Sequence, residues 1–94
     1  MDLSTLTPHA LVRMQQRGIR AEALDALLDF GAERHVHSGG REIVFLDKKA
    51  RSRLARSNPA GARAAERLKS TYAIIGAGGI VITVGHRFRR IPRD

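Results

Sequence analysis

The chain has no cysteine and no tryptophan, and its 94 residues include only one tyrosine, three phenylalanines and three prolines. The absence of cysteine excludes a disulfide framework and any thiolate metal site. With so few aromatic side chains, the core has to be built from Leu, Ile, Val and Ala. No apolar run is long enough to span a membrane, and the opening MDLSTLT lacks the basic and then apolar pattern of a signal sequence. We therefore expect a soluble, cytoplasmic protein of bacterial type, with one domain over residues 1–94.

Acidic residues are also scarce: nine Asp and Glu stand against seventeen Lys and Arg, a net charge of +8. The excess is segregated along the chain. Residues 1–47 have five basic and seven acidic side chains (net −2), residues 48–69 have eight and one (+7), and residues 70–94 have four and one (+3), which sum to +8. A basic segment of this kind favours a polyanion or an acidic protein as the partner. Fourteen of the seventeen basic residues are Arg, which suits bidentate contact with phosphate.

Two helices are expected at the start of the chain. Thr7 is a suitable N-cap, Pro8 is favourable at the first helical position, and Gly18 is a natural stop. Residues 20–30, RAEALDALLDF, predict a second helix with a leucine stripe, which ends at Gly31. The link between the two helices is short, so we expect a helical hairpin.

The first of these helices has two distinct faces when each residue advances by about 100°. Ala10, Leu11 and Met14 fall on one arc, which is expected to face the core. His9, Arg13 and Arg17 share another arc because their spacing is four residues. That second face is basic and carries a histidine in its first turn.

The hydrophobic period then changes from 3.6 to 2. Residues 32–38 and 41–47 flank a Gly-Gly pair and predict a β-hairpin, and residues 71–76 and 80–88 predict a second one. The basic segment 48–69 is typical of helix, with a break at its Asn-Pro pair. We expect an α+β fold in the order α-α-β-β-α-β-β: two N-terminal helices packed on a four-stranded, mainly antiparallel sheet, with a basic helical insertion.

Several familiar sites are not supported by the residue spacing. His35 and His37 share a strand face, but no third ligand of a suitable type is evident nearby, so we expect no metal. The glycines at 76, 78 and 79 match no nucleotide fingerprint and are better explained by a hairpin turn. The usual serine, metal and glycosidic hydrolase motifs are missing too. What remains is histidine, arginine, lysine and one tyrosine, with no cofactor implied.

This set of side chains suits one reaction well, the metal-independent cleavage of RNA. The ribose 2′-OH attacks its own phosphate, so the substrate supplies the nucleophile. The protein has to supply a base for the 2′-OH, an acid for the leaving 5′-oxygen, and cations for the charge on the phosphorane. Histidine can serve in either proton transfer because it titrates near neutrality.

The stretch TPHALVRMQQRGI resembles the Ser/Thr-x-His-Ala-x-x-Arg-Met-x-x-Arg-Gly-Ile opening of a bacterial family catalogued as a domain of unknown function, and GGIVITVGHRF is similar to its late strand. That family looks like a relative of the RelE/ParE toxins, and the resemblance covers residues 7–46 and 71–89. It implies a small basic domain with two helices on an antiparallel sheet. It also implies messenger RNA cleavage and neutralisation by an acidic antitoxin, although some relatives act on gyrase. The chain departs from the family in its longer basic segment 48–69 and in Arg20, where a Ser or Thr helix cap is usual.

The first hypothesis is therefore a toxin-type endoribonuclease with RNA and an acidic antitoxin as partners. The resemblance implies active roles for His9 and His86, which would share the proton transfers. Arg13, Arg17 and Arg87 would hold the phosphate. Two alternatives stay open: a non-catalytic nucleic-acid-binding module, and a toxin-fold protein that inhibits a host protein. Contacts to the RNA backbone are expected from the basic segment, through Lys48, Lys49, Arg51, Arg53, Arg56, Arg63, Arg67 and Lys69.

Overall fold

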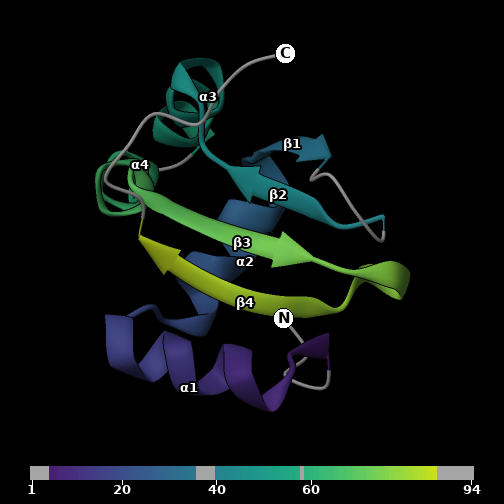
Figure 1. Ribbon diagram of the computed structural model, residues 1–94. Helices are drawn as coiled ribbons and strands as arrows, with labels where there is room; N and C mark the ends of the chain where they lie inside the picture. Colours follow the sequence, from purple (N-terminus) through teal and green to yellow (C-terminus); the bar gives the residue numbers. More distant parts are fainter. Residues whose placement is uncertain (1–4, 36–39, 58, 87–94) are drawn as a thin grey trace.

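The computed structural model describes residues 5–35, 40–57 and 59–86. For residues 33–35 it describes only the backbone. The α+β class expected from the sequence is confirmed (Figure 1). The basic segment 48–69 forms two separate helices, so the order is α-α-β-β-α-α-β-β rather than α-α-β-β-α-β-β. The elements are α1 (Pro8–Arg17), α2 (Ala21–Phe30), β1 (Ala32–His35), β2 (Glu42–Phe45), α3 (Lys48–Ser57), α4 (Gly61–Leu68), β3 (Thr71–Ile75), the 3₁₀ turn η2 (Ala77–Gly79) and β4 (Val81–His86).

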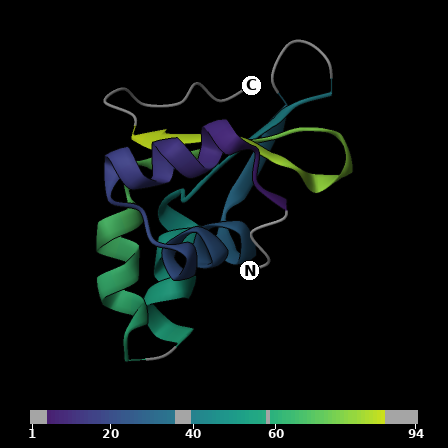
Figure 2. The same ribbon diagram turned by 90° about the horizontal axis from the view of Figure 1, so that it is seen from below.

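The strands form one antiparallel sheet in the order β1-β2-β3-β4. Helices α2, α3 and α4 lie on one face of this sheet, as Figure 2 shows from below. Helix α1 instead runs beside the edge strand β4 and packs against it (Figure 1). Helix α1 therefore meets the sheet at its β4 edge, whereas α2, α3 and α4 cover one of its faces. The short link between α1 and α2 crosses from that edge of the sheet to the covered face.

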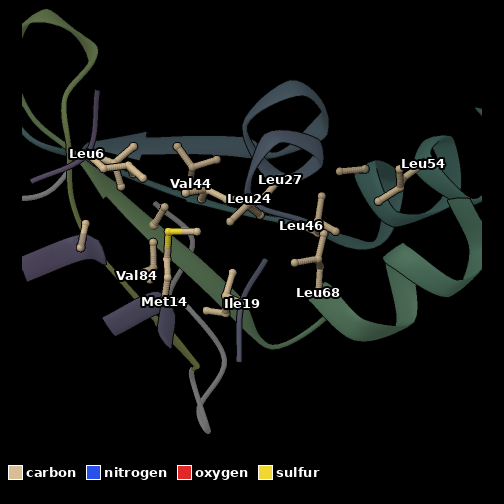
Figure 3. Close-up of a cluster of buried hydrophobic side chains, with 14 of the residues drawn as sticks. Leu6, Met14, Ile19, Leu24, Leu27, Val44, Leu46, Leu54, Leu68 and Val84 are labelled. Atoms are coloured by element: carbon tan, nitrogen blue, oxygen red, sulfur yellow. The ribbon is translucent and has the colours of Figure 1, made fainter. Parts of the chain in front are cut away.

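The core lies between the sheet and the helices, and α1, α2, α3 and α4 all contribute buried residues to it. Val44, Ala73 and Val84 are register partners across β2, β3 and β4, so their side chains share one face. Leu24 and Leu27 of α2 are fully buried in the same cluster (Figure 3). The buried members of this cluster are all aliphatic apart from one methionine, as the composition predicts.

Thr7 joins α1 to the outer edge of β4. Its hydroxyl accepts a hydrogen bond from the Ala10 amide at 3.1 Å, which makes it the N-cap of α1. The same hydroxyl donates to the carbonyl of Ile82 at 2.8 Å, and the Thr7 amide donates to the carbonyl of Val81 at 3.0 Å. These bonds satisfy edge groups that would otherwise be open to pairing with another chain.

The expectation that Leu11 faces the core was wrong. Ala10 and Met14 are buried, whereas Leu11 is 36% exposed. The reason is the position of α1: a helix lying along the edge of a sheet contacts the protein with a narrower stripe than one lying flat on its face. Only the residues that point directly at β4 are covered.

Helices α3 and α4 form a close hairpin. The Asp47 carboxylate accepts from the Ala50 amide at 2.8 Å and so caps the start of α3. At the start of α4, a Cβ atom on Gly61 would overlap the Leu54 carbonyl oxygen. Glycine is therefore required here for the close approach of the two helices.

Candidate functional site: an arginine-lined groove at the end of β4

A groove of about 720 Å³ opens between the α1–α2 link, α4 and the ends of β3 and β4. We call it the β4-end groove. Its volume is within the usual range of ligand sites in proteins. The charged and polar side chains that line it are Arg20, Glu22, Arg63, Arg67, Thr71 and His86.

The charge of the groove is predominantly positive. Arg63 and Arg67 are one turn apart on α4, so their side chains lie on the same helix face, and both are exposed. Arg20 contributes a third guanidinium group from the α1–α2 link, and among the described residues of the lining Glu22 is the only one with a carboxylate. Within the described part of the chain, no hydrogen bond or ion pair engages any of these three guanidinium groups. They are available to an anion.

His86 and Thr71 form the end of the groove that belongs to the sheet. They are register partners in the antiparallel pair β3–β4, so their side chains lie next to each other on the same face. His86 is half-buried, and Thr71 is only 1% exposed. The Thr71 hydroxyl has no hydrogen-bond partner among the described residues. An unpartnered buried hydroxyl is unfavourable, which makes this group a donor in need of an acceptor.

The structure does not bring His9 to His86. Helix α1 runs in the same direction as β4, and Thr7, two residues before His9, is bonded to Ile82 and Val81 at the start of that strand. His86 is four residues further along the strand than Ile82, a distance of about 13 Å at the usual strand rise. His9 is exposed near the opposite end of β4 and does not line the groove.

Arg13 has a structural partner. Its side chain is half-buried, and its Nε donates to the Val84 carbonyl at 3.4 Å, on the outer edge of β4. Arg17 is exposed in the last turn of α1, where a cation stabilises the helix dipole. It directly precedes Gly18, which belongs to the groove lining. Arg87 is outside the described residues.

The eight cations of segment 48–69 divide between different surfaces. Arg63 and Arg67 line the β4-end groove. A second hollow of about 340 Å³ lies at the other end of α2, beside Phe30. Arg53 donates to the Phe30 carbonyl there at 3.3 Å. The cations that line this second hollow are Lys49, Arg53 and Arg56.

The remaining cations of the segment are partly engaged or lie elsewhere. Lys69 donates to the Glu66 carboxylate at 2.8 Å. This hydrogen bond, and then the charge of Lys69, lower the pKa of Glu66. Arg51 is half-buried, with a buried Nε that has no hydrogen-bond partner among the described residues, and Lys48 is exposed at the start of α3. The eight cations of the segment therefore do not all line one groove.

Arg20 and Thr71 were not among the site residues predicted from the sequence. Arg20 could have been found, because an arginine stands where the resembled family has a helix cap. Thr71 has no such signal, since a threonine in a strand is ordinary and only the fold shows that its hydroxyl is buried without a partner.

No metal site emerges from the described residues, which contain no cluster of three His, Cys, Asp or Glu side chains able to hold an ion. The side chain of His35 and the whole of His37 are outside the described part, so that pair stays untested. In residues 5–35, 40–57 and 59–86, no helix has both the length and the apolar character needed to cross a membrane.

No protein-family model matches the chain, and no match was found among curated proteins or solved structures. The function proposed for the β4-end groove therefore rests on the chemistry of the residues that line it.

Proposed function

We propose that this protein is a toxin-type endoribonuclease that binds RNA in the β4-end groove and cleaves it without a metal ion. The observation that carries the proposal is the grouping of three unpaired arginines with a half-buried histidine in one groove. Arginine binds phosphate through a planar fork of donors, and histidine transfers protons near neutral pH. RNA is the substrate that needs both, because it carries its own nucleophile.

In the proposed reaction, His86 accepts the proton of a ribose 2′-OH. The 2′-oxygen forms a bond to the adjacent phosphorus, and the bond from phosphorus to the 5′-oxygen breaks. Water supplies the proton for the departing 5′-oxygen, so the products are a 2′,3′-cyclic phosphate and a 5′-hydroxyl. Arg63 and Arg67 stabilise the charge that develops on the phosphorane. An acidic antitoxin is the matching partner, because its carboxylates compete for the same guanidinium groups.

A non-catalytic RNA-binding module is the second candidate. One observation favours it: the described groove contains a single histidine, since His9 lies near the other end of β4. A single proton-transfer group is compatible with binding alone. The two candidates share the groove and differ only in what happens to the RNA.

The test is cleavage of end-labelled RNA by purified protein in EDTA, with His86→Gln and His9→Gln as matched variants. The proposal predicts cyclic-phosphate products from the parent and from His9→Gln. It predicts a loss of about 10²-fold or more for His86→Gln, the usual scale for losing a general base. Binding without cleavage by the parent would support the second candidate. A loss in His9→Gln as large as in His86→Gln would contradict the location of the active site in the groove.

A further inference from the structure

The first turn of α2 forms one wall of the β4-end groove, and its backbone amides are not capped. Arg20 is the N-cap residue, with φ −82° and ψ 157°, and its side chain makes no capping hydrogen bond. A guanidinium group cannot cap, because it has no acceptor atom. The N–H groups of Ala21, Glu22 and Ala23 belong to the turn that has no partners within the helix.

Arg20 also adds a positive charge at the N-terminus of α2. The N-terminus of an α-helix carries a partial positive charge, so a cation is unfavourable there. Arg20 is such a cation, and Arg63 and Arg67 line the same groove from α4. Glu22 offsets only one of these three charges. Amide donors and a net positive charge thus gather at this wall, where Glu22 is the one carboxylate among the described residues. Uncapped amides with surplus positive charge are typical of phosphate sites on helix N-termini.

An independent observation comes from the other wall of the groove. Thr71 lines the groove from β3, and its hydroxyl is buried without a partner among residues 5–35, 40–57 and 59–86. Thr71 belongs to β3 and not to α2. Since Thr71 and the first turn of α2 line the same groove, an oxygen-rich anion held in that groove is the acceptor that we assign to this hydroxyl.

We infer that the N-terminus of α2, Arg20 and the Thr71 hydroxyl form a phosphate-binding subsite. The inference deepens the proposed function and rests on it only for RNA as the source of the phosphate. The subsite holds one phosphate group and thereby sets the register of the RNA chain relative to His86. Phosphate contacts of this kind position a nucleic acid without reading its sequence.

Two substitutions separate a ligand site from ordinary structure. Arg20→Thr supplies a cap from within the chain and removes the charge. Thr71→Val keeps the shape and removes the unpartnered hydroxyl, so the fold should keep or gain stability. If Thr71 served only the fold, Thr71→Val would lower the melting temperature and leave phosphate binding unchanged.

The experiment is an NMR titration of the full chain with inorganic phosphate, with sodium chloride used to hold the ionic strength constant. We expect the largest amide shifts at Ala21, Glu22 and Ala23, and an affinity about tenfold lower in each variant, the scale of one charge-assisted hydrogen bond. Absence of shifts at these amides, or variants that bind phosphate like the parent, would overturn the inference. This readout needs no RNA, so it stays separate from a failure of cleavage.

The source of the phosphate is identified with two short oligoribonucleotides, one carrying a 5′-phosphate and one a 5′-hydroxyl. Preference for the 5′-phosphorylated RNA that disappears in Arg20→Thr assigns the subsite to a terminal phosphate. Equal binding of both, weakened equally by Arg20→Thr, assigns it to an internal phosphodiester. Equal binding that Arg20→Thr leaves unchanged would contradict a role for the subsite in binding RNA.

Discussion

Arg20→Thr is expected to stabilise the free protein, and the structure itself contains the comparison on which this prediction rests. Thr7, the N-cap of α1, has φ −70° and ψ 158°, in the same extended region as the backbone at Arg20 (φ −82°, ψ 157°). The Thr7 hydroxyl accepts from the amide three residues later at 3.1 Å. A threonine at position 20 can therefore accept from the Ala23 amide without any change in the backbone.

The expected increase in the free energy of unfolding of Arg20→Thr has two contributions. A new N-cap is worth about 1 kcal/mol. Removal of an exposed cation from the positive end of α2 adds roughly 0.5 kcal/mol, which salt will screen. The free energy of unfolding should rise by about 1.5 kcal/mol, which for a domain of this size raises the Tm by roughly 6–12 °C.

The assay is thermal unfolding, followed by far-UV circular dichroism in a low-salt buffer without phosphate. Arg20→Ala is the control, because it removes the charge and supplies no cap. It should gain only about 0.5 kcal/mol, or roughly 2–4 °C. A Tm for Arg20→Thr no higher than that of Arg20→Ala would refute the statement that the first turn of α2 lacks a cap. A stabilising change that also weakens phosphate binding is typical of functional sites.

Three further substitutions test separate parts of the account. Thr7→Val removes the cap of α1 and the bond to the Ile82 carbonyl, so we expect a loss of about 2 kcal/mol in chemical denaturation, and a loss under about 0.5 kcal/mol would contradict both roles. Gly61→Ala should destabilise by about 2 kcal/mol, because the overlap with the Leu54 carbonyl outweighs the better helix propensity of alanine; a more stable variant would show that the two helices can separate freely. Glu22→Gln should raise RNA affinity about two- to fivefold at low salt by removing a carboxylate from the groove lining, and weaker binding would place the RNA elsewhere.

The local structure of this chain could be predicted from the sequence because its signals are local. Thr7, Pro8 and Gly18 fix the ends of α1 through capping and backbone conformation, and Gly18 has the positive φ of 65° that a helix stop of this kind requires. The hairpin turn at residues 77–79 likewise has positive φ values at Gly78 and Gly79. Each of these helix ends and turns is determined by a few neighbouring residues.

The groove could not be predicted in the same way, because it depends on which distant elements meet. The pattern of α1 placed His9 and Arg13 one turn apart on the helix, yet it could not show that α1 would lie along β4 and engage Arg13 with the strand edge. Nor could it show that α4 would bring Arg63 and Arg67 to the end of the sheet beside His86. Helix periodicity identifies a face, and only the packing decides what that face meets.

The most direct test of the account is the salt dependence of RNA binding for two matched double variants of the basic segment. Arg63→Gln/Arg67→Gln removes two charges from the β4-end groove, and Arg53→Gln/Arg56→Gln removes two from the second hollow. If the groove binds RNA phosphates, the first pair reduces the magnitude of the negative slope of log affinity against log salt by about 1.4, and the second pair leaves the slope nearly unchanged. Equal changes in slope for the two pairs, or a larger change for the second, would contradict the assignment of RNA binding to the groove.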